Sequence, residues 1–379
     1  MDALLNATIH TGTAILSDAA VLIDGDSIAA VVPRADVPTY ARQHDLDGGV
    51  LTPGFIDAQV NGGGGVLFND HPDRDAIRAI AAAHRRFGTT ALLPTFITDS
   101  RETRRLAVDA IADALAAGEP GVLGIHLEGP HIDSGRRGVH DSRFIGPPDD
   151  EDLLLMTRLG PGRTLVTLAP ELVPAATIRD LTARGVRVCA GHTAATWEQA
   201  QAGIAAGICG FTHLYNAMSP LGHREPGAVG AALTDDRVWC GIVVDGHHVH
   251  DAAVRLAWKA KPAGKLFLVT DAMPPVGAPP GDFQLYGQTV TVQDGRCLSA
   301  DGRLAGSALD MATAVRNCVE RIGIPLDEAL RMASAYPADF LGIADRRGRI
   351  ASGMAADLVH LDEGLRPTAT WVGGKMERC

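Results

Sequence analysis

Short apolar runs alternate with helix-length segments through the middle of the chain. Each run is suited to a strand buried on both faces, as the strands of a parallel sheet are. Segments with helical spacing stand between them, such as 73–88, which ends in glycine, a usual C-terminal stop for a helix. Eight such runs predict an α/β fold, a (β/α)8 TIM-like barrel. The runs are LTPGFID (51–57), TTALLPTF (89–96), GVLGIHLE (121–128), TLVTLAP (164–170), GVRVCAGH (185–192), GICGFTH (207–213), WCGIVVDGHH (239–248) and KLFLVTD (265–271).

The two ends of the chain have a different pattern, with short β-type pieces punctuated by Gly, Asp and Pro. Examples are AVLIDG and SIAAVVP before residue 50, and a similar stretch begins at Gly348. We therefore expect a small β-sandwich domain formed by both termini, residues 1–50 and 345–379, with the barrel at 51–344. A further β-type stretch, 283–298, follows the eighth run and should overhang the barrel mouth.

Charge and cysteine content narrow the range of partners. The chain has 379 residues and a formal charge of −11, which supplies no field to attract nucleic acid or an anionic membrane. No apolar stretch approaches the length of a membrane span, and the N-terminus is unlike a secretory signal. The six cysteines show no CxxC spacing and fit a reducing compartment. We expect a cytoplasmic protein without nucleic-acid or membrane partners.

Five polar residues each stand just past an apolar run: Glu128, His192, His213, His248 and Asp271. The C-terminal ends of barrel strands meet at one mouth, so these side chains should meet there too. His192 and His213 are one βα repeat apart and can sit on adjacent strands, while Glu128 adds a carboxylate. One Glu and two His with an open position is a usual catalytic zinc set. For any one of these histidines taken alone, a structural role is the better interpretation. Metal binding becomes the better one because all three residues end strands on the same face of the predicted barrel.

Asp271 has two interpretations. Taken alone, it fits a helix cap or a salt-bridge partner equally well. At the end of the eighth strand it could instead act as a general base that takes a proton from water and returns it to a leaving amine.

A second polar group lies on or beside the same predicted mouth and contains His140, Asn216, Arg224 and His248. Arg224 alone would be a surface charge, and His140 alone could be solvated. Together, near a metal, these residues offer charge-assisted donors to an anionic group such as phosphate.

Eight segments in order resemble the N-acetylglucosamine-6-phosphate deacetylase family of the amidohydrolase superfamily. Together they span nearly the whole chain, and their order is more specific than any one of them. The segments are PGFIDAQVNGGGG, HLEGPHI, GHT, THLYNAM, HREPGAVG, VVDGHHVH, VTDAM and LAGSALDM.

The resemblance implies one divalent metal per subunit, usually Zn²⁺, on Glu128, His192 and His213, with Asp271 as catalytic acid and base. The implied reaction is hydrolysis of the acetamide of N-acetylglucosamine 6-phosphate to glucosamine 6-phosphate and acetate, in amino-sugar catabolism and cell-wall sugar recycling. It also implies that His140 polarises the acetamide carbonyl. In this family an arginine crosses a dimer interface, so Arg224 is expected to serve the neighbouring subunit of a homodimer. The other implied substrate contacts are Val139, Asn216, Ala217, His248, Leu304, Ala305 and Gly306.

One departure from the superfamily pattern concerns the first strand. Many amidohydrolases carry HxH there and hold two metals, whereas this chain has Gln59 and Asn61 at the corresponding positions. Neutral amides are weak zinc ligands. We therefore expect one tightly held metal, with Gln59 and Asn61 contacting water at most, and a weakly occupied second site as the alternative.

Two other functions remain open. The same chemistry on N-acetylgalactosamine 6-phosphate differs only in the orientation of one ring hydroxyl, which loop geometry would read. A non-catalytic assembly protein on an inactive amidohydrolase barrel is disfavoured because Glu128, His192, His213 and Asp271 are all present.

Overall fold

The computed structural model describes all 379 residues. Its central feature is an eight-stranded parallel sheet in which each strand pairs with the next along the chain. The edges meet where Val60 bridges Ala272, so the sheet curls into a nearly closed barrel. The predicted barrel is confirmed. Its strands are β8 (Phe55–Val60), β11 (Thr89–Ile97), β12 (Ile125–Glu128), β13 (Thr164–Leu168), β14 (Arg187–Ala190), β15 (Gly210–Phe211), β16 (Trp239–Ile242) and β17 (Leu266–Leu268).

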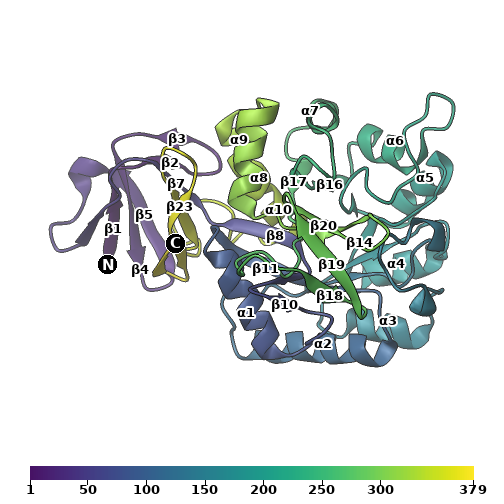
Figure 1. Ribbon diagram of the computed structural model, residues 1–379. Coiled ribbons are helices and arrows are strands. Elements are labelled where there is room, and N and C mark those ends of the chain that lie inside the picture. Colours follow the sequence, from purple (N-terminus) through teal and green to yellow (C-terminus); the bar gives the residue numbers. More distant parts are fainter.

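Helices cover the outside of the barrel (Figure 1). Their ends follow local sequence signals: in α5 the side chain of Thr196 accepts from the Gln199 N–H, and the helix ends at Gly207, whose φ is 126°. The helices are α1 (Arg74–Arg85), α2 (Arg101–Ala116), α3 (Asp150–Thr157), α4 (Ala175–Ala183), α5 (Trp197–Ala206), α6 (Gly227–Thr234), α7 (Asp251–Ala260), α8 (Met311–Asn317), α9 (Leu326–Ala333) and α10 (Ala335–Leu341). A π-helical turn, Cys318–Ile322, continues α8.

The chain ends build two further sheets beside the barrel (Figure 1). Buried side chains from both sheets share one apolar cluster that includes Leu4, Val21, Leu51, Leu358 and Trp371. This arrangement confirms the predicted small sandwich formed by both termini. One sheet contains β5 (Ser27–Pro33), β4 (Ala19–Asp24), β1 (Asp2–Leu5) and β6 (Arg42–Asp45). The other contains β24 (Lys375–Arg378), β23 (Pro367–Val372), β22 (Leu358–Leu361), β7 (Val50–Pro53), β2 (Thr8–His10) and β3 (Ile15–Leu16).

The first predicted barrel strand was wrong in one respect. The run 51–57 divides at Gly54 into β7, which pairs with β2 and β22 of the sandwich, and β8, which enters the barrel. A Cβ on Gly54 would lie only 2.1 Å from Cγ2 of Thr90. The missing side chain therefore lets the chain pass tightly from one domain to the other.

An antiparallel insertion follows β17 and lies in front of the barrel in Figure 1, as expected for 283–298. Its last strand reaches the barrel where Ser307 bridges Ala272. The four strands are β18 (Phe283–Leu285), β19 (Gln288–Gln293), β20 (Arg296–Leu298) and β21 (Leu304–Ser307). A small sheet of β9 (Gly62–Gly63) and β10 (Val66–Leu67) follows β8.

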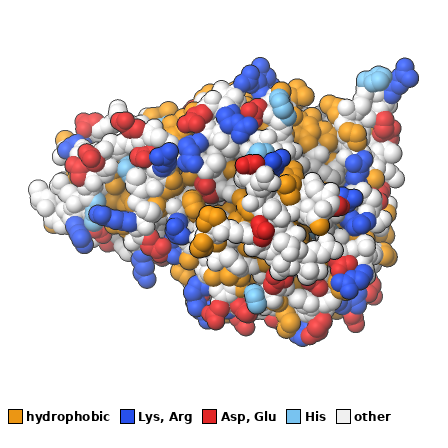
Figure 2. Space-filling model, viewed as in Figure 1, with side chains coloured by type: hydrophobic (Ala, Val, Ile, Leu, Met, Phe, Trp, Pro, Cys, Tyr) orange, Lys and Arg blue, Asp and Glu red, His pale blue; other side chains and the backbone are white.

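Three features relate to the partners and compartment expected from the sequence: the charges on the surface, the length of the helices and the state of the cysteines. Figure 2 shows acidic and basic side chains interspersed over the viewed face. No helix is both long enough and apolar enough to cross a membrane. The six cysteines are free.

Candidate active site

The strand ends bring Glu128, His192, His213 and Asp271 to the same mouth of the barrel. Glu128 is the last residue of β12, and the others follow β14, β15 and β17 within three residues. His192, His213 and Asp271 have positive φ angles of 48°, 36° and 53°. Non-glycine residues rarely adopt this conformation, and it concentrates at functional sites. The sharp turn after each strand aims the side chain into the mouth.

Three donor atoms converge at this point. Oε1 of Glu128 lies 2.9 Å from Nε2 of His213 and 3.1 Å from Nε2 of His192, and the two Nε2 atoms are 3.0 Å apart. Tetrahedral zinc ligands at about 2.0–2.1 Å from the ion lie about 3.3 Å from one another, so the spacing fits one small cation. All three side chains are buried. Their residue types and geometry fit a single divalent metal.

The charges in this cluster balance one another. Burial opposes ionisation of Glu128, but the rings of His192 and His213 hold the pKa of its carboxyl well below the usual range. Burial acts to lower the pKa of His213, but the hydrogen bond and negative charge of the Glu128 carboxylate outweigh burial and raise it. Nδ1 of His192 lies 2.9 Å from the backbone oxygen of Arg136, to which it donates, and this contact leaves Nε2 free to act as a ligand.

Asp271 lies beside this cluster and is held by amides from β8 and the residue after it. Nδ2 of Asn61 donates to Oδ1 of Asp271 at 2.6 Å, and Nε2 of Gln59 donates to the same atom at 3.2 Å. The Gln59 amide also lies 3.2 Å from both carboxylate oxygens of Glu128. Burial and the negative charge of Glu128 raise the pKa of Asp271 to about 6. Such a carboxyl can both take and return a proton near neutral pH.

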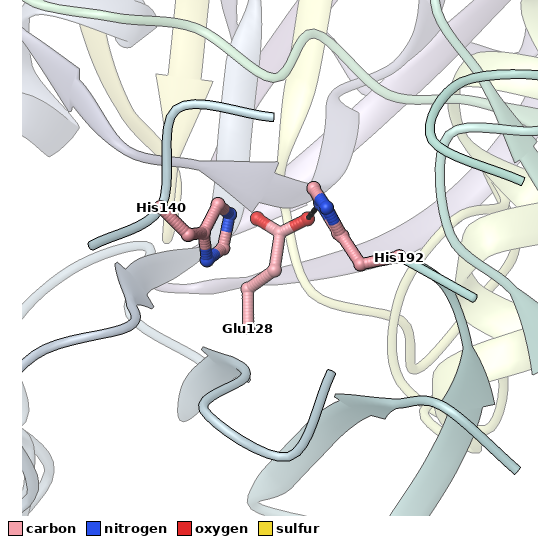
Figure 3. A group of neighbouring side chains, drawn as sticks. All are labelled: Glu128, His140 and His192. Atoms are coloured by element: carbon pink, nitrogen blue, oxygen red, sulfur yellow. Dashed lines mark hydrogen bonds and ion pairs between the residues drawn. The ribbon is translucent and has the colours of Figure 1, made fainter. Parts of the chain in front are cut away.

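His140 approaches the cluster from the loop between β12 and α3. Figure 3 shows its ring on one side of the Glu128 carboxylate and His192 on the other. Nδ1 of His140 lies 2.8 Å from Oγ1 of Thr98, and the backbone N–H of Thr98 points to the same nitrogen at 3.4 Å. That N–H can only donate, so Nδ1 accepts and the ring proton sits on Nε2. Burial, with the nearby His192 ring, lowers the pKa of His140 to about 3, so it is a neutral donor.

A cavity of about 300 Å³ opens onto these residues. Every site residue expected from the sequence lines it except Gln59, which lies behind Glu128 and Asp271, and Arg224. Arg224 is exposed on the loop before α6. The expected lining residues are Asn61, Glu128, Val139, His140, His192, His213, Asn216, Ala217, His248, Asp271, Leu304, Ala305 and Gly306.

Sequence reasoning missed other lining residues, such as Arg136, Met273 and Arg303. It also missed two supporting residues, Thr98 behind His140 and Asp245 behind His248. Both follow barrel strands, so the strand-end argument could have found them.

The Amidohydrolase family model matches residues 50–378. The chain belongs to the amidohydrolase family. A second model, the NagA composite domain, matches residues 1–51 of this amidohydrolase. The family is metal-dependent, in agreement with the donor atoms of Glu128, His192 and His213 that converge at the mouth. The His140 ring also lies near the donor atoms of Glu128 and His192, but its Nδ1 is held by Thr98, so we assign the metal to the other three residues.

This amidohydrolase is similar to two deacetylases in sequence and to a third in structure. It is 45% identical to an N-acetylgalactosamine-6-phosphate deacetylase of Shewanella sp. (strain ANA-3), over 90% of this chain and 86% of the relative. It is 39% identical to an N-acetylglucosamine-6-phosphate deacetylase of Haemophilus influenzae, over 98% of each chain. The crystal structure of N-acetylglucosamine-6-phosphate deacetylase from Pasteurella multocida matches with a TM-score of 0.97 and 38% identity, over 100% of both chains.

Proposed function

We propose that this amidohydrolase removes the acetyl group of N-acetyl-D-glucosamine 6-phosphate, giving D-glucosamine 6-phosphate and acetate. The observation that carries the proposal is the buried cluster of Glu128, His192 and His213 beside Asp271, at the bottom of a cavity large enough for a small sugar. Two relatives named for this activity support the proposal, because they are 39% and 38% identical over 98% and 100% of this chain.

Glu128, His192 and His213 would hold one metal ion, for which Zn²⁺ suits the ligand set. A divalent metal bound there polarises a carbonyl and lowers the pKa of water. Gln59 and Asn61 donate N–H groups to Asp271 and Glu128, so they orient carboxylates where other amidohydrolases carry histidines. This arrangement supports one metal ion rather than two.

The remaining steps belong to the chain itself. Asp271 takes a proton from the attacking water and delivers one to the departing amine. Nε2–H of His140 donates a hydrogen bond to the carbonyl oxygen, where negative charge develops. His248, Asn216 and Ala217 line the same cavity, and in this proposal they bind the sugar phosphate. Val139 and the Leu304–Gly306 segment enclose the sugar ring.

The galactosamine epimer is a second candidate because a relative named for it is 45% identical. We favour glucosamine as the substrate. We place the protein in the cytoplasm, which its free cysteines support. We also infer a homodimer in which Arg224 completes the site of the neighbouring subunit.

The test measures acetate release by zinc-loaded protein from N-acetylglucosamine 6-phosphate, N-acetylgalactosamine 6-phosphate and unphosphorylated N-acetylglucosamine. The highest kcat/KM should belong to N-acetylglucosamine 6-phosphate. A higher value for the galactosamine epimer would reverse the assignment of the sugar. Equal values with and without phosphate would remove the phosphate site, and no acetate from any of them would refute deacetylation.

A further inference from the structure

The turn that carries His248 has a buried acid at its start. This turn begins at Asp245, shortly after β16, and His248 points from it into the catalytic cavity. The Asp245 and His248 side chains are only 6% and 7% exposed. A buried carboxylate is costly unless hydrogen bonds satisfy it, so its contacts indicate what it does.

The Asp245 carboxylate makes contacts only within its own turn. Oδ1 accepts from the backbone N–H groups of His247 and His248, each at 2.8 Å, and Oδ2 lies 2.6 Å from Nδ1 of His248. Burial opposes ionisation, but the His248 ring and these N–H groups lower the pKa of Asp245 to about 2. The group is therefore a carboxylate at neutral pH, and Nδ1 of His248 carries the proton between them.

The turn itself is fixed from behind. Gly246 has a φ of 82°, and a Cβ there would lie 2.2 Å from the Arg321 guanidinium. Arg321 packs into that space and donates to the backbone oxygen of Asp245 and to the carboxylate of Asp251. Asn317 donates to the backbone oxygen of Val244 at 2.8 Å. The His248 ring thus has little freedom, and its second nitrogen, Nε2, is left for the cavity.

We propose that Asp245 is a positioning residue for recognition of the substrate phosphate: its carboxylate holds Nδ1–H of His248 so that Nε2–H of the charged ring donates to that group. This inference rests on the proposed function, in which His248 binds the phosphate. An imidazole between a carboxylate and a phosphate keeps protons on both nitrogens, since each neighbour accepts one. Without the carboxylate, the ring loses both its fixed direction and the partner that stabilises its charge.

Asp245→Asn separates this role from a merely structural one. The two backbone N–H groups need an acceptor, so the amide oxygen takes the place of Oδ1 and the NH₂ group faces Nδ1 of His248. A donor facing Nδ1 excludes a proton there, so the ring can no longer be charged. The turn keeps its hydrogen bonds and Nε2–H can still donate, but it does so from a neutral ring, so recognition of the phosphate is weakened. Asp251→Asn is the matched control because it makes the same change nearby, at a carboxylate that contacts Arg321 instead of His248.

The experiment compares kcat/KM for N-acetylglucosamine 6-phosphate and for N-acetylglucosamine in metal-loaded protein, and their ratio defines the phosphate preference. Asp245→Asn should lower this preference by about tenfold, mainly through KM, because a charge-assisted hydrogen bond to the phosphate becomes a neutral one. The rate with the unphosphorylated sugar should change little, and Asp251→Asn should keep the preference. In a His248→Asn background, Asp245→Asn should lower the preference no further.

An equal loss for both substrates in Asp245→Asn, or an unchanged preference, would overturn the proposal. Should that variant not fold, Asp245→Ser is judged by the same ratio, because its hydroxyl can accept from the turn but cannot reach the ring. Calorimetric binding of inorganic phosphate supplies a readout that does not need turnover. If the wild type released no acetate, the proposed function would fail. Weaker phosphate binding by Asp245→Asn than by Asp251→Asn would then still support the positioning role, and equal binding would refute it.

Discussion

Asp271 shows how its surroundings determine what a single residue can do. An ordinary surface aspartate is ionised at neutral pH, and it is a poor proton donor there. Here burial and Glu128 raise the pKa to about 6, while Asn61 and Gln59 fix the direction of the carboxylate. The same side chain can therefore accept a proton and later return it.

Replacing Asp271 by Asn should lower kcat by about 10²–10⁴-fold, the usual range for loss of a general acid and base. Metal content should not change, because the three converging donor atoms come from Glu128, His192 and His213. Steady-state rates and zinc content of the same preparation check both statements. A zinc-loaded variant with a rate near that of the wild type would refute the role.

Asp57 is a second buried acid, and its effect is on stability. Its side chain is fully buried in β8, where it accepts hydrogen bonds from the hydroxyl and N–H of Thr270 and the N–H of Gln59. Burial raises its pKa to about 7, whereas an unfolded aspartate has a pKa of about 3.9. Between these values the folded state binds more protons than the unfolded state. The free energy of unfolding should therefore fall as pH rises from about 4 to about 7.

Asp57→Asn should remove this part of the pH dependence, since an amide does not titrate. Relative to the variant, the free energy of unfolding of the wild type should fall by up to about 1.4 kcal/mol per pH unit between about pH 4 and about pH 7. Above about pH 7 the difference should stay constant. Urea unfolding of both chelator-treated proteins at about pH 5 and about pH 8 measures the difference. Chelation removes the pH dependence of metal binding. Parallel stability curves for the two proteins would contradict the expectation.

At the scale of elements, the strand periodicity was enough to predict the barrel and the sandwich, and the strand-end rule placed Glu128, His192 and His213 at one mouth. Parallel strands share a direction, so position along the sequence fixes which end a residue occupies. The contacts of Thr98 with His140 and of Gln59 with Glu128 could not be predicted in this way. These contacts depend on how strands and loops that are far apart in the sequence are positioned around the barrel. A local sequence pattern does not predict that positioning.

The division of the first run into β7 and β8 has a similar cause. Both halves have the same apolar, strand-forming composition, so only the tertiary contact of Gly54 with Thr90 marks the boundary. β7 has four residues and β8 has six, and the glycine between them permits the close approach of the backbone to Thr90.

Gly54→Ala should lower the free energy of unfolding by about 1–3 kcal/mol, as overpacked sites usually do. The added Cβ would lie within 2.6 Å of three side-chain atoms of Thr90. Gly281→Ala is the control, because a Cβ at Gly281 meets nothing within 4 Å. Thr90→Ala should recover part of the loss in the double variant, since it removes two of the three clashing atoms. Equal stabilities of the Gly54 and Gly281 variants in urea would rule out the close contact.

At the scale of the whole molecule, Arg224 is the expected substrate-binding residue that does not line the cavity of its own chain. It is exposed on the loop before α6, three residues after Leu221, an apolar side chain that is 51% exposed. An exposed charge beside an exposed apolar side chain is suited to an interface between subunits. In a symmetric dimer, a residue that leaves one site can complete the other.

Coexpression of two variants with different defects tests whether Arg224 acts across such an interface. Arg224→Ala should raise KM for the phosphorylated sugar, whereas Asp271→Asn should abolish turnover. In a mixed dimer, one site would combine an intact Asp271 with the partner's intact Arg224. Random pairing would then restore about a quarter of the wild-type sites, measured at low substrate concentration where Arg224→Ala alone is weakest. If Arg224 acts within its own chain, no site is complete. The mixture would then give only the sum of the separate activities.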